Sequence, residues 1–259
     1  MRRYLFGIVA ITLSLQYAYA DHATLPDGVT PVMATWLWGY HTVPASITKD
    51  GYPRLYAYPH TDANRINDPP WTEVAARDMK AGARVPAMLW LHGCDGMPRG
   101  SVGYRVYFMS KGYALFEPDS FARPGHRCDD GNVPKRREEI SHAFEQISEL
   151  SWIDQGRIIL VGISEGGRTV VGWEKPGFAA HIILMAGCRW GDRFIRAPAG
   201  IPLLAIMGGD DEYFAGYPCE VTRQIGGSRS IVIPGAPHDI MDRREVRKAL
   251  DVFLKECCQ

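Results

Sequence analysis

From residue 85 onward, short apolar runs alternate with longer segments of helical periodicity. The apolar runs, which we expect to be strands, cover residues 85–91, 113–117, 157–161, 181–185, 203–207 and 230–233. Strands that alternate with helices form β-α-β units, in which neighbouring strands run parallel. The sequence therefore predicts an α/β protein, a three-layer sandwich with a mostly parallel central sheet.

Between these runs we expect helices at residues 103–111, 134–150, 166–173, 217–225 and 243–257. In the second segment, Ile140, Ala143, Ile147 and Leu150 recur at spacings of three and four, which gives the helix one apolar face. This helix begins with Lys135, Arg136 and Arg137 and continues with Glu138 and Glu139, a run that we interpret as a solvated helix start.

Residues 21–80 have a different character, rich in proline and aromatic residues. One strand is expected there, at residues 54–58. We predict an N-terminal extension that packs on the sheet and adds strands at its edge, before a main domain at residues 81–259. The default role for the aromatic residues is core and edge packing; a ligand surface is the alternative.

The first twenty residues have the features of a secretory signal peptide. Arg2 and Arg3 are followed by an apolar run at residues 5–15, and Ala18-Tyr19-Ala20 offers a cleavage site before Asp21. We therefore expect residues 1–20 to be removed and the protein to be secreted or periplasmic, without a stable membrane span. A membrane anchor is the alternative.

The balance of basic and acidic residues argues against nucleic-acid binding. Without Arg2 and Arg3, the 29 basic residues fall to 27 against 29 acidic ones, and they are scattered along the chain. Phosphate binding needs a clustered positive field. The oligomeric state is not defined by the sequence.

Six cysteines remain after residue 20: Cys94, Cys128, Cys188, Cys219, Cys257 and Cys258. An even number in an exported chain favours disulfides. We expect Cys94 to pair with Cys128 and Cys188 with Cys219, with free buried thiols as the alternative. No zinc-ligand spacing is present, and we expect neither a metal nor another cofactor.

The pentapeptide Gly162-Ile163-Ser164-Glu165-Gly166 joins an expected strand to an expected helix. A serine in such a turn can be held in a strained conformation with its hydroxyl exposed, the arrangement called a nucleophile elbow. A glycine-rich turn with a bystander serine is the alternative. In this context we predict that Ser164 is a nucleophile.

A serine nucleophile needs a base and a carboxylate, and both follow in chain order. Asp210 and Asp211 come directly after the expected strand 203–207, where open α/β sheets place their ligands. We favour Asp211 as the acid, with Asp210 as the alternative. His238 is the only histidine after His181, and it lies on a Pro/Gly-rich loop after the last strand. We predict that His238 is the general base.

The oxyanion hole is expected in the loop after the first long strand. Residues 92–96 read His-Gly-Cys-Asp-Gly, and the glycines allow backbone N–H groups to turn outward. We assign the two donors to the amides of Cys94 and Glu165.

Together these motifs resemble the dienelactone hydrolase family within the α/β-hydrolase fold, over about residues 80 to 255. The matching stretches are residues 91–96, 116–121, 154–158, 162–167, 208–211 and 234–238. The resemblance implies Ser164, Asp211 and His238 as the catalytic triad.

Two departures distinguish this chain from that family. The dienelactone hydrolases proper have a cysteine nucleophile, whereas this chain has Ser164, as many exported relatives do. Relatives commonly carry histidine after the nucleophile, where this chain has Glu165. A carboxylate there would oppose an oxyanion, so we expect the side chain of Glu165 to point away or to pair with a cation.

The leading hypothesis is a serine hydrolase that cleaves small carboxylic esters or lactones. The alternatives are a serine peptidase of the prolyl-oligopeptidase type and a non-catalytic binding protein that keeps the fold.

Overall fold

The structure is a computed structural model that describes residues 25–57, 71–96, 102–128, 132–188, 194–214 and 216–258. The expected signal peptide at residues 1–20 and Tyr58, the last residue of the expected strand 54–58, lie outside these ranges. Among the described residues, no helix is both long enough and apolar enough to cross a membrane.

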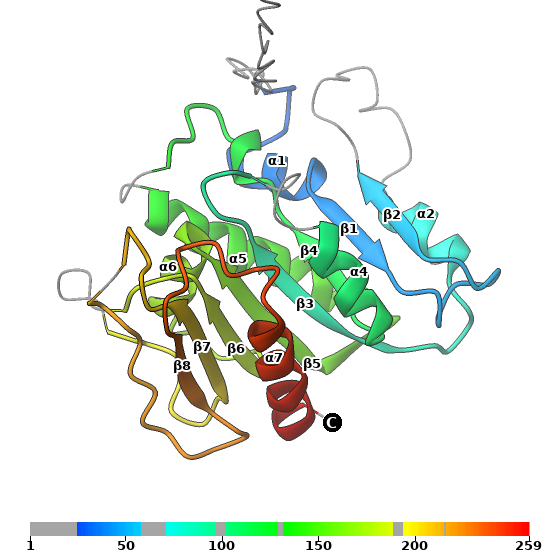
Figure 1. Ribbon diagram of the computed structural model, residues 1–259. Helices are drawn as coiled ribbons and strands as arrows, with labels where there is room; N and C mark the ends of the chain where they lie inside the picture. The colour runs from blue at the N-terminus through cyan, green and yellow to red at the C-terminus, as the bar shows by residue number, and fades with distance from the viewer. Residues whose placement is uncertain are drawn as a thin grey trace, which may run out of the picture.

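Eight strands form one sheet in the order β2-β1-β4-β3-β5-β6-β7-β8 (Figure 1). The strands are β1 (Tyr40–Val43), β2 (Arg54–Ala57), β3 (Val85–Leu91), β4 (Ala114–Glu117), β5 (Ile153–Ile163), β6 (Ala180–Leu184), β7 (Leu203–Gly208) and β8 (Arg229–Ile233). From β4 to β8 every neighbouring pair is parallel, whereas β1 pairs antiparallel with both β4 and β2. The predicted strands are thus confirmed, and β1 and β2 extend one edge of the sheet.

The helices are α1 (Pro31–Leu37), α2 (Trp71–Asp78), α4 (Val102–Ser110), α5 (Val133–Ser148), α6 (Glu165–Val171) and α7 (Arg244–Cys257), with a 3₁₀ helix η2 (Ser120–Ala122). In Figure 1, α4 and α7 lie on one face of the sheet and α5 and α6 on the other. The predicted three-layer α/β sandwich is therefore confirmed.

Two apolar clusters separate the layers, and the central strands supply both. Along β3, Leu89 and Leu91 belong to the cluster under α5 and α6, and Met88 and Trp90 to the cluster under α7. All seven residues of β3 are buried, because a strand with helices on both faces has no solvated side. The core thus holds rigid the carboxyl ends of β3, β5 and β7, where the site residues lie.

Three aromatic residues of the N-terminal segment, Trp36, Tyr56 and Trp71, pack in the core, whereas Tyr52 is exposed. Trp36 and Trp71 are each 2% exposed, and the ring of His41 stacks on that of Trp71 at 4.2 Å between centroids. Burial lowers the pKa of His41 to about 3, although its hydrogen bond with the carbonyl of Trp36 acts in the opposite direction. These contacts follow the packing interpretation rather than a ligand surface.

The helix expected at residues 217–225 is wrong, because the chain there has no helical turn. Pro218 cannot donate a backbone hydrogen bond, and Cys219 is tied to Cys188. The amide of Val221 donates to Ser230 Oγ at 2.8 Å, so the segment runs beside β8. Tertiary contacts have overridden the local helical pattern.

Three disulfides are present, and both predicted pairs are confirmed: Cys94 with Cys128, and Cys188 with Cys219. The adjacent Cys257 and Cys258 form the third at the end of α7. No free cysteine occurs among the described residues.

Candidate active site

Ser164 occupies the turn between β5 and α6 in a strained backbone conformation. Its φ of 52° and ψ of −115° are rarely adopted by a residue with a side chain. Its N–H donates to the carbonyl of Leu184 at 2.9 Å, and its carbonyl accepts from the amide of Arg168 at 2.9 Å. Strain held in place by the surrounding hydrogen bonds is typical of a functional position.

The glycines of the pentapeptide are required because the turn packs directly on the strands. A Cβ on Gly162 would lie 2.3 Å from the carbonyl oxygen of Gly166. A Cβ on Gly166 would lie 2.3 Å from the carbonyl oxygen of Leu91, the last residue of β3. The motif therefore holds Ser164 directly beside the end of β3.

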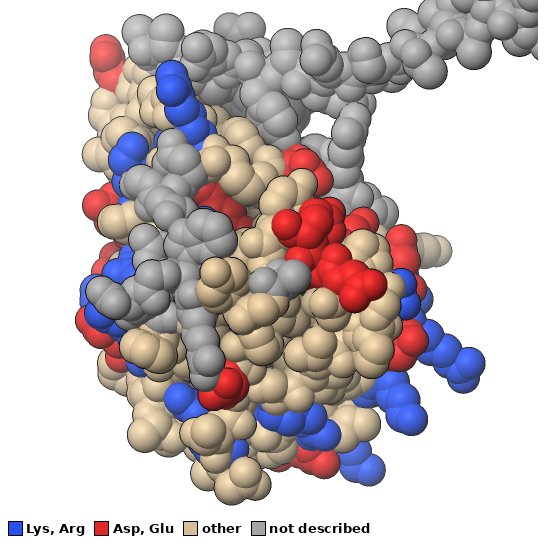
Figure 2. Space-filling model, turned by 60° about the vertical axis from the view of Figure 1, so that its left-hand side comes forward, with Lys and Arg blue, Asp and Glu red and all other residues tan. Residues whose placement is uncertain are grey.

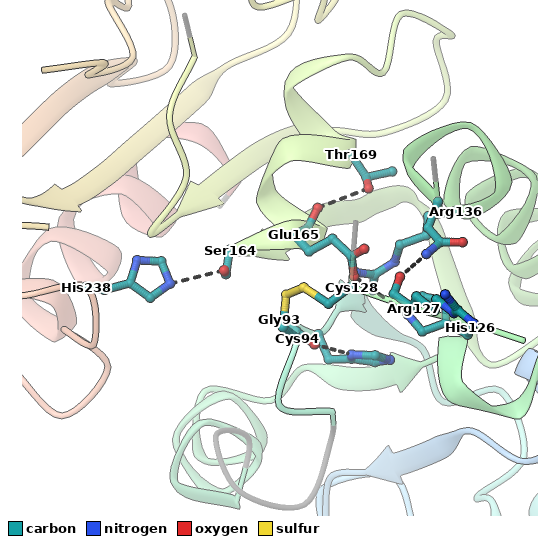
Figure 3. Close-up of a disulfide and its surroundings, with 12 residues drawn as sticks. Gly93, Cys94, His126, Arg127, Cys128, Arg136, Ser164, Glu165, Thr169 and His238 are labelled. Atoms are coloured by element: carbon teal, nitrogen blue, oxygen red, sulfur yellow. Dashed lines mark hydrogen bonds and ion pairs between the residues drawn. A yellow bond between two sulfur atoms is a disulfide. The ribbon is translucent and has the colours of Figure 1, made fainter. Parts of the chain in front are cut away.

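His238 bridges Ser164 and Asp211 (Figure 3 shows the Ser164 contact). Its Nε2 lies 3.0 Å from Ser164 Oγ, and its Nδ1 lies 2.8 Å from Asp211 Oδ2. These three residues come from the ends of β5 and β7 and from the loop after β8. The structure thus brings together the three side chains that the sequence singled out.

Of the two adjacent acids, Asp211 is the one that faces the histidine. Asp211 is fully buried, and its Oδ1 accepts hydrogen bonds from the amides of Tyr213 and Phe214, each at 2.9 Å. Asp210 is exposed, and its amide donates to the carbonyl of Ala236. With one oxygen held by two amides, the other oxygen of Asp211 is aimed at His238.

Two supports of His238 were not predicted from the sequence. The carboxylate of Glu212 accepts the backbone N–H of His238 at 3.0 Å, and the ring of Tyr213 meets the imidazole edge-on at 4.9 Å between centroids. A Cβ on Gly208 would lie 2.1 Å from the carbonyl oxygen of Pro237, so the histidine loop packs against the end of β7. The only available signal was that Glu212 and Tyr213 directly follow Asp211.

Met185 is a third residue that the sequence did not reveal. It follows β6 with a φ of 54°, and its sulfur accepts a hydrogen bond from the amide of Ile240 at 3.4 Å. A positive φ normally favours glycine, so a methionine in the sequence gives no indication that the backbone adopts this conformation. Met185 links the wall of the site to the histidine loop.

The loop after β3 packs on Ser164 through Gly93. A Cβ on Gly93 would lie 3.1 Å from Ser164 Cβ, so the chain passes very close to the turn that carries Ser164. Among the described residues, the amide of Cys94 donates to no backbone carbonyl, and that of Glu165 is the first of α6, where no intrahelical acceptor exists. Both residues line one cavity with Ser164.

The carboxylate of Glu165 is buried and pairs with a cation, as expected. Its Oε2 lies 3.0 Å from Arg136 Nη1 and 3.7 Å from His126 Nε2. Burial raises the pKa of Glu165, and the positive charge of Arg136 offsets part of that shift. The charge is thereby balanced beneath the elbow, away from Ser164 (Figure 3).

Arg136 also corrects the expectation of a solvated start to α5. Arg136 and Glu139 are buried, whereas Lys135 and Glu138 are exposed. Glu139 accepts from Arg123 Nε at 2.8 Å, so a buried ionic network lies between α5 and the elbow. Alternation of charges in the sequence did not show which side of the helix they occupy.

His92 is buried next to the site, but its hydrogen bonds define a neutral ring. Its Nε2 accepts the amide hydrogen of Ser120 at 3.0 Å, so its Nδ1 carries the proton and donates to the carbonyl of Gly93 at 2.7 Å. Burial lowers the pKa of His92 well below its usual range. His92 therefore anchors the loop and cannot readily take a second proton.

A cavity of about 610 Å³ opens above Ser164. Apolar side chains make up much of its wall: Trp90, Ile163, Met185, Tyr213, Phe214 and Met241. The charged residues in its wall are Asp95, Glu165, Arg168 and Asp239. Figure 2 shows the charges on one face of the molecule. The largest group of acidic side chains lies right of the centre of this view, while Lys and Arg lie mainly around its edges.

Comparison with solved structures defines the fold class. A protein provisionally named a dienelactone hydrolase from Klebsiella pneumoniae matches with a TM-score of 0.51 at 14% identity, covering 68% of this chain and 88% of that one. Esterase PE8 matches with a TM-score of 0.51 at 15% identity, covering 68% and 94%. A protein provisionally named a dipeptidyl aminopeptidase IV from Bacteroides ovatus matches with a TM-score of 0.51 at 17% identity, covering 69% and 32%.

The chain has the α/β-hydrolase fold. At these identities the structural likeness establishes the fold, and the resemblance to dienelactone hydrolases is met again among the structural neighbours. No protein-family model matches the sequence, and no curated protein matches it significantly.

Proposed function

We propose that this protein is a serine hydrolase that cleaves carboxylic esters or lactones through a Ser164-His238-Asp211 triad. The observation that carries the proposal is the unbroken hydrogen-bonded chain from Ser164 Oγ through His238 to the buried Asp211. A hydroxyl, an imidazole and a carboxylate in this order form the apparatus of nucleophilic acyl transfer.

In the first half-reaction, Ser164 Oγ attacks the ester carbonyl while His238 Nε2 takes its proton. Asp211 accepts the Nδ1–H of His238, which fixes the tautomer and stabilises the imidazolium that forms. The backbone N–H groups of Cys94 and Glu165 stabilise the tetrahedral oxyanion. His238 then protonates the leaving alcohol, and an acyl group remains on Ser164.

Water completes the reaction by attacking the acyl-enzyme, with His238 again as general base. In a lactone the leaving alcohol stays tethered to the acyl group, and the same steps open the ring. No step calls for a metal or an organic cofactor.

The cavity supports a small ester as substrate. Its volume of about 610 Å³ lies within the range for sites that enclose a small molecule, and its wall is largely apolar. The ester group would be held by polar groups at Ser164, with apolar acyl or alcohol portions against the aromatic and methionine side chains.

Turnover of p-nitrophenyl acetate and butyrate, with aminoacyl p-nitroanilides in parallel, tests this function. We expect ester hydrolysis by the wild type, loss of it in Ser164→Ala, and no cleavage of the amides. Preferential cleavage of the amides would favour a peptidase. Retained ligand binding without turnover of any ester would favour a binding protein.

We also propose that the protein is exported after removal of residues 1–20. Three disulfides support this proposal, because disulfides persist mainly in oxidising compartments. N-terminal sequencing of the protein expressed from its full sequence should give Asp21 as the first residue of material recovered outside the cytoplasm. An intact N-terminus in the membrane fraction would contradict it.

A further inference from the structure

The Cys94–Cys128 disulfide lies at the site itself, in the wall of the cavity that contains Ser164. Cys94 belongs to the loop after β3, and Cys128 to the loop between η2 and α5. The two sulfur atoms and a carboxylate oxygen of Glu165 all lie within 4.8 Å of one another. Figure 3 shows the bond between Gly93 and Glu165, on the side of Ser164 away from His238.

Contacts hold the loop after β3 on both sides of Cys94. Before it, His92 is buried, its ring is bonded to Ser120 and Gly93, and Gly93 packs on Ser164. After it, the amide of Gly96 donates back to the carbonyl of Gly93 at 3.2 Å, which closes a turn within the loop itself. The disulfide ties Cys94 itself to Cys128, in the loop before α5.

We propose that the Cys94–Cys128 disulfide is a positioning element of the oxyanion hole. By joining Cys94 to the loop before α5, the disulfide fixes the position of the N–H of residue 94 relative to the N–H of Glu165, at the start of α6. The two donors can then reach the same oxyanion. Oxyanion donors act only when they lie at hydrogen-bond distance from the developing charge, and loss of one such donor costs about 10²- to 10³-fold in kcat. This inference rests on the proposed function.

The chain contains a matched control for this role. The Cys188–Cys219 disulfide spans 31 residues, close to the 34 spanned by Cys94–Cys128, so the loop entropies that the two bonds remove from the unfolded chain are nearly equal. Neither Cys188 nor Cys219 lines the cavity with Ser164. If each disulfide only stabilised the fold, removal of either one would therefore have a similar effect on stability and on kcat.

The test compares Cys94→Ala/Cys128→Ala with Cys188→Ala/Cys219→Ala on p-nitrophenyl butyrate. Alanine keeps the amide of residue 94 and removes only the tie. We expect the first variant to lose about tenfold or more in kcat with KM within about twofold of the wild type, because the tie acts on the transition state. The second variant should keep the wild-type kcat below its melting temperature.

Equal kcat in the two variants, or a change confined to KM, would overturn the proposal. If the first variant fails to fold, mild reduction of the wild type replaces it. The two thiols of dithiothreitol reduce a disulfide to two thiols and close to a cyclic disulfide, and exposed Cys128 makes this bond the accessible one of the two. With peptide mapping to identify the opened bond, kcat should fall on opening of Cys94–Cys128 and recover on reoxidation; an unchanged kcat would overturn the proposal.

The wild-type assay separates the two levels of inference. Absence of ester turnover in the oxidised wild type would count against the proposed function. Normal wild-type turnover with no effect of the missing Cys94–Cys128 bond would count against the positioning role alone.

Discussion

Asp210 and Asp211 are adjacent in the sequence, yet their side chains have opposite surroundings. Asp211 is buried and contacts His238, whereas Asp210 is exposed at the turn. We expect Asp211→Asn to lower kcat by about 10⁴-fold, because the amide favours the wrong tautomer of the histidine. Asp210→Asn, the matched control, should change kcat by less than about threefold. A comparable loss of kcat in the two variants would show that Asp211 is not the specific acid of the triad.

Other single residues show where sequence reasoning reaches its limit. The order of Ser164, Asp211 and His238 was visible because each follows a recognisable strand. Glu212 and Met185 were not, since their contributions are a contact with a backbone amide and a strained turn. Such roles depend on three-dimensional proximity and leave no pattern in a single sequence.

Helix α6 can approach β3 closely because its second residue, Gly166, has no side chain. Gly166→Ala would place a methyl group 2.3 Å from the carbonyl oxygen of Leu91, so we expect a loss of more than about 2 kcal/mol in the free energy of unfolding. Gly103→Ala is the control, because Gly103 lies exposed in α4 with no atom within 4 Å of the new Cβ. That substitution should be neutral or stabilising by up to about 1 kcal/mol.

Urea unfolding of the two alanine variants checks the packing of α6. We expect a lower urea midpoint for Gly166→Ala than for the wild type, and an unchanged or higher one for Gly103→Ala. Similar midpoints in both variants would mean that the close approach of α6 to β3 is not a packing constraint.

Helix α5 supplies the cation that balances Glu165. Arg136→Met would leave the buried carboxylate without its partner at 3.0 Å, which we expect to cost about 3–5 kcal/mol of stability. Lys135→Met, one residue earlier on the exposed side, should cost less than about 0.5 kcal/mol. Chemical denaturation of both variants measures the difference.

A second substitution distinguishes loss of charge balance from loss of packing. Arg136→Met/Glu165→Gln should recover part of the lost stability, because it removes the orphaned charge. No recovery in the double variant would show that the arginine acts mainly through its packing.

Burial lowers the pKa of three histidines, His41, His92 and His181, and so links the stability of the whole molecule to pH. Burial lowers the pKa of both His41 and His181 to about 3, against 6.5 for an ordinary histidine. Between pH 6.5 and pH 3 the unfolded chain binds a proton at each that the folded chain does not, so each contributes stability that is present above pH 6.5 and lost as pH falls. The slope is about 1.4 kcal/mol per pH unit per histidine.

The variant His181→Leu isolates one of these contributions. Both ring nitrogens of His181 are buried without a hydrogen-bond partner, so leucine removes the titration without breaking a bond. We expect the free energy of unfolding to fall less steeply in the variant than in the wild type from pH 6.5 to pH 4. Parallel pH profiles from urea titrations would contradict the assignment.

The overall architecture was largely predictable because alternating strands and helices leave a strong periodic signal. The α/β sandwich, the parallel strands from β3 onward and two disulfides followed from patterning and cysteine positions. The helix expected at residues 217–225 failed because a disulfide and side-chain contacts hold that segment along β8. The buried ionic face of α5 was missed because a run of charged residues in the sequence does not indicate which of them are buried.

We propose that residues 21–80 and 81–259 fold as one unit, because β1 and β2 belong to the same sheet.

The proposed reaction depends on Ser164 being a nucleophile activated by His238. Reaction of the folded protein with a fluorophosphonate probe, followed by mass spectrometry of the labelled peptide, tests it most directly. We expect one adduct on Ser164 in the wild type, none in Ser164→Ala and much slower labelling in His238→Ala. An unlabelled wild type, or equal labelling of Ser164→Ala, would contradict it.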